Sequence, residues 1–119
     1  MDIEFLDPAE APLPPDQVSF RSVEVEPYSD GQRLLVRLSV TPFQERPTID
    51  LEVQDEQGVR LAASSIVEAT DATMSLTLHL QRPSSGLQYT LVARLLYEGL
   101  GEVDRAEAGF VLPKPKQER

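Results

Sequence analysis

The residues from 87 to 112, LQYTLVARLLYEGLGEVDRAEAGFVL, constrain the fold of this chain more than any other stretch. Every second position of the first half is apolar or aromatic, at Tyr89, Leu91, Ala93, Leu95 and Tyr97. A period of two is that of a pleated β-strand and not that of an α-helix. Because Gly99 and Gly101 mark a turn, the stretch predicts a long β-hairpin whose strands end near Tyr97 and begin again near Glu102.

Upstream of the hairpin the same alternation predicts further strands at about residues 18–26, 32–41, 48–54, 59–67 and 73–81. The alternation changes phase near Arg21 and Ser22, and such a slip predicts a β-bulge in the first strand. The alternation of 59–67 is weaker and irregular, which is typical of a short edge strand.

Seven strands without a helical stretch predict an all-β chain, most simply a seven-stranded antiparallel two-sheet sandwich. A small closed barrel or an open-barrel binding fold stays an alternative, because a period of two does not distinguish two packed sheets from one closed sheet. The chain has 119 residues and no cysteine. It therefore fits one domain that is held by packing and backbone hydrogen bonds rather than by disulfides.

Three segments are expected. Residues 1–17 contain four prolines among acids and alanines, and they predict a lead that is largely extended or disordered. Within this lead, Ile3 and Phe5 alternate, so that pairing with a sheet edge is a second interpretation. Residues 18–112 form the sandwich domain, and residues 113–119 form a basic tail of proline and lysine.

The formal net charge is −9, and the chain has no basic stripe. Such a chain repels phosphate backbones and anionic lipids, so neither a nucleic acid nor a membrane is an expected partner. No apolar run reaches the length of a membrane span, and the first residues are acidic rather than basic and then apolar. We therefore expect a cytoplasmic protein if Met1 is the native start, although an exported chain trimmed of its signal would look the same.

The segment PSSGLQYTLVARL resembles the corner before the penultimate strand of fibronectin type III and bacterial immunoglobulin-like modules. In those families the hydroxyl of the corner tyrosine bonds back to nearby backbone, and Tyr89 is the matching position. The resemblance implies an immunoglobulin-like sandwich with Tyr89 as a structural residue. It does not imply a function, because such modules have many roles.

Catalytic chemistry has little support in the sequence. His79 is the only histidine, and it lies in the middle of a predicted strand between outward threonine and glutamine residues. We interpret it as an exposed sheet residue, since no nucleophile motif accompanies it and zinc would need further histidine or cysteine ligands. The GLG of residues 99–101 lacks the helix and lysine of a phosphate-binding loop, so no catalytic residue and no cofactor is expected.

Acidic residues are expected to gather at one pole, because successive antiparallel strands bring the connections 42–47, 68–72 and 98–102 to the same end. Calcium prefers six to eight oxygen ligands from loops. The candidate ligands are Glu68, Asp71, Glu98, Glu102 and Asp104, with Glu45 beside them. The spacing of a dedicated calcium loop is missing, so a solvated acidic rim is the favoured interpretation and no metal is expected.

These observations favour a non-enzymatic protein-interaction or structural module with an unidentified protein partner. The expected contact regions are the edge near residues 59–67 and the acidic pole. A homodimer through a sheet face or edge is a further hypothesis, with Leu35, Leu87, Val92 and Leu96 marking a second apolar surface. The alternative is a small-ligand or carbohydrate-binding accessory domain, for which Tyr28 and Tyr97 could supply aromatic platforms.

Overall fold

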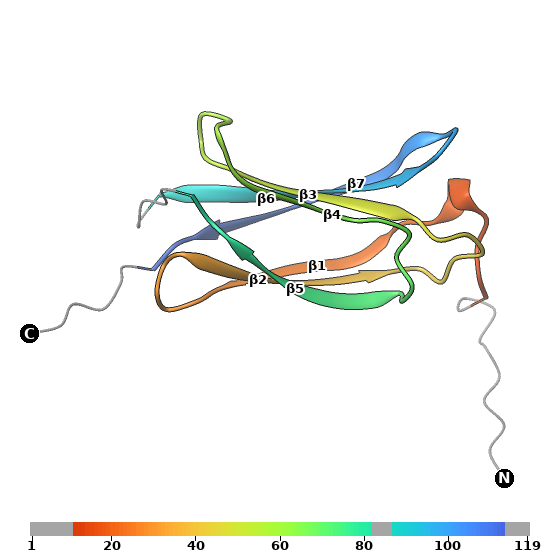
Figure 1. The fold of residues 1–119 in the computed structure, drawn as a ribbon, viewed down its shortest axis with the longest axis horizontal. Coiled ribbons are helices and arrows are strands. Elements are labelled where there is room, and N and C mark those ends of the chain that lie inside the picture. Colours follow the sequence, from red (N-terminus) through yellow and green to blue (C-terminus); the bar gives the residue numbers. More distant parts are fainter. Residues whose placement is uncertain (1–10, 82–86, 114–119) are drawn as a thin grey trace, which may run out of the picture.

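The computed structural model describes residues 11–81 and 87–113, which form seven strands in two antiparallel sheets (Figure 1). The strands are β1 (Phe20–Pro27), β2 (Arg33–Val40), β3 (Thr48–Gln54), β4 (Arg60–Ile66), β5 (Thr73–His79), β6 (Gln88–Tyr97) and β7 (Gly101–Val111). One sheet has the order β1-β2-β5 and the other has the order β4-β3-β6-β7. The two sheets lie one above the other as separate layers, so the sandwich prediction is confirmed and the closed barrel is wrong.

The core lies between the layers and is made by alternate residues of both sheets. In β2 the inward residues are at most 1% exposed, at Leu34, Val36, Leu38 and Val40. The alternating residues of β6 that predicted the hairpin are all buried as well, at Tyr89, Leu91, Ala93, Leu95 and Tyr97. Burying a leucine or valine side chain of this kind stabilises the folded state by about 1.5–3 kcal/mol. The sequence period and the hydrophobic effect thus specify the same inner faces.

Both predicted irregularities are present. In the pairing of β1 with β2, the register shifts between Phe20 and Ser22. In the pairing of β3 with β4, Val53 lies opposite Ala62 while Gln54 lies opposite Arg60, so that Leu61 is an extra residue. Each shift is a β-bulge, which bends the strand and interrupts its ladder.

Two strand ends differ from the sequence prediction by two residues each. β1 begins at Phe20 rather than Val18, because the Val18 N–H closes a 3₁₀ turn, η2 (Pro15–Gln17), by donating to the Pro15 carbonyl over 3.4 Å. β5 ends at His79 rather than Gln81, because the Gln81 N–H donates to the Leu61 carbonyl of the other sheet over 2.9 Å.

The described part of the lead packs on the domain. The Leu13 N–H donates to the Pro42 carbonyl over 3.0 Å, and the Leu13 carbonyl accepts from the Gln44 N–H over 2.9 Å. The Leu13 side chain packs against the core, as does Phe43, with which it forms an isolated parallel bridge. The predicted alternation of Ile3 and Phe5 and most of the basic tail lie outside the described residues. No helix within residues 11–81 or 87–113 is long and apolar enough to cross a membrane.

Candidate functional site

The side of the sandwich where β1 meets β7 is closed and charged. The Phe20 N–H at the start of β1 donates to the Asp104 carboxylate of β7, with a nitrogen to oxygen distance of 2.8 Å. Charged residues are frequent along both strands, at Arg21, Glu24, Glu26, Glu102, Asp104, Arg105 and Glu107. Charges on an edge strand discourage a further strand from pairing, so this side is protected.

The opposite side, where β4 and β5 are the outermost strands, lacks that protection. The run from Leu61 to Val67 contains no charged residue, and β5 contains no aspartate, glutamate, lysine or arginine. Small side chains occupy the middle of β4, at Ala62, Ala63, Ser64 and Ser65. The Gln81 N–H covers the carbonyl of Leu61, but no described residue makes a backbone hydrogen bond to residues 62–66 from outside the β3–β4 pair. We call residues 59–67 the open edge.

Exposed valines flank the open edge at both ends. Val59 is 56% exposed and Val67 is 70% exposed. They are among the few large apolar side chains that are so exposed in the described chain. A short edge strand whose only charge is at its first residue, Arg60, and which lies between two exposed apolar side chains, is a feature that proteins usually avoid unless the edge is covered by a partner. The predicted contact region near residues 59–67 thus coincides with an unprotected edge.

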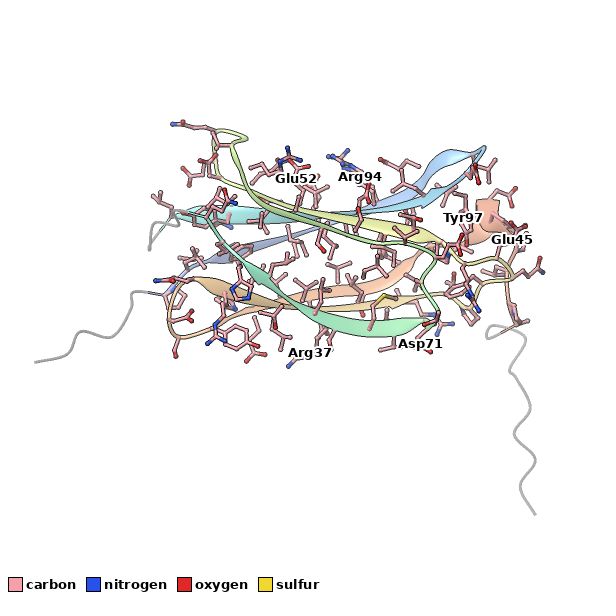
Figure 2. The ribbon with its side chains drawn as sticks, in the orientation of Figure 1. Arg37, Glu45, Glu52, Asp71, Arg94 and Tyr97 are labelled. Atoms are coloured by element: carbon pink, nitrogen blue, oxygen red, sulfur yellow. The ribbon has the colours of Figure 1, made fainter. Side chains whose placement is uncertain are left out.

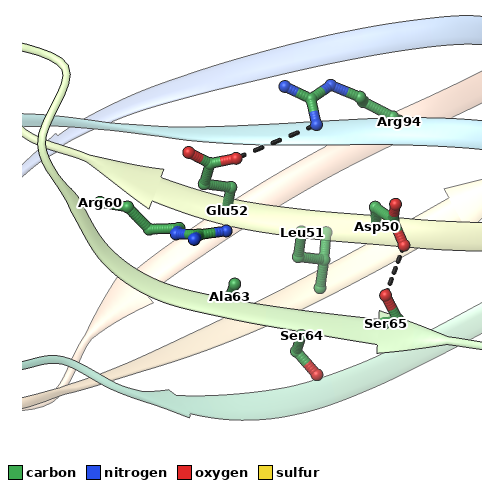
Figure 3. A pocket seen from close by; sticks show the side chains of 8 residues that line it. All are labelled: Asp50, Leu51, Glu52, Arg60, Ala63, Ser64, Ser65 and Arg94. Carbon is green, nitrogen blue, oxygen red and sulfur yellow. Dashed lines mark hydrogen bonds and ion pairs between the residues drawn. The ribbon is translucent and has the colours of Figure 1, made fainter.

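The outer face of the four-stranded sheet is polar and ion-paired. The Arg94 guanidinium lies 3.9 Å from the Glu52 carboxylate and 3.6 Å from the Glu102 carboxylate. Figure 3 shows Arg60 and Arg94 on either side of Glu52, in a shallow hollow of about 310 Å³ that borders β4. The other lining residues are Asp50, Leu51, Ala63, Ser64 and Ser65, with the Ser65 hydroxyl donating to the Asp50 carboxylate.

The expected second apolar surface does not form. Val92 is only 2% exposed, although it lies in register between Glu52 and Glu107 on the outer face of β6. Leu35 is on the other sheet, opposite Thr77. Val92 and Leu96 share the outer face of β6 but Leu35 lies on the other sheet, which the alternation of a single strand could not reveal.

The predicted acidic pole does form. The Ala69 N–H donates to the Pro47 carbonyl over 2.8 Å, which joins two of its connections. A hollow of about 740 Å³ lies there, lined by Glu45, Arg46, Thr48, Val67, Glu68, Leu96, Tyr97 and Glu98. The Tyr97 hydroxyl donates to the Glu45 carbonyl over 2.7 Å, and both residues lie at this end of the molecule in Figure 2. Burial, and then the negative charge of Glu45, raise the pKa of Tyr97 above its usual value.

The calcium candidates are not assembled around one point. Glu68 and Glu98 line the acidic hollow, whereas Glu102 pairs with Arg94 and Asp104 accepts from the Phe20 N–H. Asp71 accepts from the adjacent Thr70 hydroxyl over 3.5 Å. Among the described residues, no three histidine, cysteine or acidic side chains are placed to hold a metal ion.

His79 is exposed and lies opposite Arg33 in the pairing of β2 with β5. Apart from the tyrosines, no polar or charged residue of the described chain is buried. Active sites usually combine ionisable groups with apolar surroundings that shift their pKa values. The environment of His79 shows no such combination.

Tyr89 is 2% exposed, and its ring stacks on Phe110 with 5.7 Å between the ring centroids. It is therefore a core residue. Residues 82–86, which contain most of the turn before it, lie outside the described residues.

A third hollow, of about 430 Å³, lies on the outer face of the three-stranded sheet, near the β1–β2 turn. Its lining includes Tyr28, Leu35 and the pair formed by Arg37 and Glu26, whose nitrogen and oxygen are 3.1 Å apart. Arg33 lies over the Tyr28 ring, 4.2 Å from its centroid.

Asp30 fixes the position of Arg33. Its carboxylate accepts from the Gln32 N–H over 2.8 Å and from Arg33 Nε over 2.8 Å. These bonds, first that of Gln32 and then that of Arg33, hold the pKa of Asp30 below its usual value. The sequence analysis predicted Tyr28 as an aromatic platform. It did not predict the Arg37–Glu26 pair beside it or the contact of Arg33 with its ring.

The described chain is thus a two-sheet antiparallel β-sandwich with one closed and one open side. No protein-family model and no curated protein matches the sequence. Solved structures do match the fold. One is a β-glucuronidase from Bifidobacterium dentium, at a TM-score of 0.67 and 15% identity, over 82% of this chain and 18% of that one.

A glycosyl hydrolase family 2 member from Bacteroides cellulosilyticus matches at a TM-score of 0.65 and 12% identity, over 80% of this chain. β-Glucuronidase 3 from Bacteroides uniformis matches at 0.60 and 19% identity, over 79% of this chain. This chain spans only 14% and 12% of the length of those two proteins. At these identities the likeness shows the fold alone.

Proposed function

We propose that this chain is a non-catalytic, immunoglobulin-like β-sandwich module that binds an extended segment of a protein partner along the open edge. The observation that carries the proposal is the uncharged run from Leu61 to Val67 on an outermost strand. An extended peptide can add to such an edge as a further strand, with affinity from main-chain hydrogen bonds and specificity from alternate side chains. On the outer face, the hollow beside Ala63 contains Arg60 and Asp50, which would select polar partner side chains.

The arrangement of strands supports the immunoglobulin-like part of this proposal. The sheet orders β1-β2-β5 and β4-β3-β6-β7 combine consecutive hairpins with crossings between the layers. In the three similar structures, the matched region is between 12% and 18% of the chain. A domain that forms a small part of a long chain can act as a binding module without catalysing a reaction. The exposed position of His79 fits such a non-catalytic role.

The proposal is tested by selecting peptides from a random display library against the full chain. We expect binders with alternating apolar residues, whose affinity falls at least tenfold in Ser64→Lys, because an inward-pointing charge on an edge strand opposes pairing. Ser22→Lys is the matched control, since Ser22 lies on β1 at the closed side and should change affinity less than twofold. Selection without binders, or binders indifferent to Ser64→Lys, would contradict the proposal.

A second candidate is a small-ligand or carbohydrate-binding accessory domain, favoured by the hollow at Tyr28. It combines an aromatic ring, the Leu35 side chain and the Arg37–Glu26 pair, a mixture of apolar wall and few polar groups that is typical of ligand sites. Titrating a panel of sugars while recording amide shifts near Tyr28 tests this candidate. Binding that Tyr28→Ala abolishes would support it, and no shifts at tens of millimolar sugar would reject it.

A further inference from the structure

The open edge is complementary to itself, and we infer that a second copy of this chain binds there, with the two β4 strands antiparallel and centred on Ala63. This inference rests on the proposed function, because it names an occupant for the same edge. A two-fold axis through such a pair makes one continuous eight-stranded sheet out of two four-stranded sheets.

The facing of the side chains permits this pairing at residues 62–64. Opposite residues of an antiparallel pair point to the same side of the sheet. With Ala63 opposite Ala63 of the partner subunit, Ala62 lies opposite Ser64 of the partner subunit. Ala62 and Ser64 both point inward, since they lie in register with the buried Val53 and Leu51. Ala63 points outward, in register with Glu52.

The ends of the open edge match each other as well. Val59 and Val67 lie on opposite sides of Ala63, with the extra residue Leu61 between Val59 and Ala63, so antiparallel pairing brings the Val59 end of one copy near the Val67 end of the other. Their exposed fractions, 56% and 70%, would decrease on both sides of the axis. Removing this apolar surface from water favours association.

Charge at the ends also agrees with the pairing. Arg60 adjoins Val59 and Glu68 adjoins Val67, so each end of the pair brings an arginine near a glutamate of the other copy. Between them lie only uncharged side chains, and no like charges oppose each other. By contrast, contact through the outer face would desolvate the ion pairs of Arg94, which is costly. The edge is therefore the favoured contact. The area is small and the net charge is −9, so we expect a weak dimer at high protein concentration.

Single cysteines test the inference directly, because the natural chain contains none. In the inferred pair the two Ala63 residues have Cα atoms about 4.5–5.5 Å apart, within the range of a disulfide. The two Ser65 side chains are four residue steps apart, about 13 Å, and cannot be bridged. Under mild oxidation we expect Ala63→Cys to form a crosslinked dimer rapidly, at least tenfold faster than Ser65→Cys or the β5 control Ser75→Cys.

Sedimentation of the chain without cysteine gives a second measurement. We expect a monomer–dimer equilibrium at high concentration that Ser64→Lys abolishes and Ser22→Lys leaves within twofold, with melting temperatures recorded to confirm folding. If Ser64→Lys does not fold, Ala63→Lys replaces it. Equal crosslinking of all three cysteine variants, or sedimentation as monomer alone, would overturn the inference.

Two further outcomes separate the inference from the proposed function. A monomer that binds selected peptides in a manner sensitive to Ser64→Lys overturns the dimer and leaves the function standing. A dimer abolished by Phe5→Glu, which changes the alternating residues of the lead and not β4, would assign the added strand to that lead and overturn the symmetric pairing.

Discussion

Replacing Asp104 by alanine tests how the closed side of the sandwich is held together. The Asp104 carboxylate accepts the Phe20 N–H over 2.8 Å, across 84 positions of the chain. Without it, a partly buried backbone donor loses its acceptor at the point where β1 begins.

The size of the effect follows from the bond. A hydrogen bond to a charged group contributes about 1.5–3 kcal/mol, and the lower figure applies here because Asp104 is only partly buried. A loss of about 1.5 kcal/mol lowers the melting temperature of a domain of this size by about 6–12 °C. Asp104→Asn retains an oxygen acceptor without the charge and should lose about half as much.

Urea unfolding followed by circular dichroism measures the free energy of unfolding of each variant. The m-value should not change, since the surface exposed on unfolding is the same. Amide exchange of Phe20 should accelerate in Asp104→Ala. Asp71→Ala is the control, because Asp71 makes only a long contact with the Thr70 hydroxyl, and surface changes of this kind cost less than about 0.5 kcal/mol. Equal stabilities of the two alanine variants would refute the reasoning about the closed side.

Three further predictions concern the core, the acidic pole and calcium. Leu91→Ala should lower the free energy of unfolding in urea by about 2–5 kcal/mol, because Leu91 is 0% exposed. Val111→Ala, at a position 51% exposed, should lower it by less than about 0.5 kcal/mol. Equal losses of stability would contradict the assignment of Leu91 to the inner face. Tyr97→Phe should cost about 1 kcal/mol near neutral pH. Because the folded pKa of Tyr97 is raised above 10.0, its contribution is present below that pH and is lost as the pH rises through the folded pKa, so the two proteins should converge in stability in alkali. Millimolar calcium should leave the melting temperature unchanged, whereas an upward shift would show that the separated carboxylates do assemble around the ion.

The sequence predicted the fold well wherever one residue in two had to be apolar. The inner faces of β2 and β6 follow from that period alone, because a one-residue slip would expose every leucine. The bulge in β1 was also visible, since a bulge breaks the period, and the alternation of residues 59–67 indicated an irregularity in β4 without placing it at Leu61. Strand ends were less accurate, because the bonds of Val18 and Gln81 to other segments compete with the ladder.

The sites were harder to predict than the fold. The antiparallel order of the strands predicted that the connections would lie together at the acidic pole. The ion pair of Glu102 with Arg94 depends on side-chain orientations, which the alternation of residues does not predict. The predicted second apolar surface was wrong because Leu35 lies on the other sheet and Val92 is buried. The charge-free run from Leu61 to Val67 is visible in the sequence. The irregular alternation of residues 59–67 predicted an edge strand, and β4 does lie at the edge of its sheet.

Amide hydrogen exchange, recorded residue by residue, is the most direct test of the claim that the open edge is the contact surface. It should be measured on the full chain alone, with a selected peptide, and at raised protein concentration. We predict that protection increases within residues 62–66 while β1 and β7 remain unchanged, because an added strand bonds only to the amides that it covers. Increased protection on β1 or β7, or none along β4 in either condition, would contradict the account.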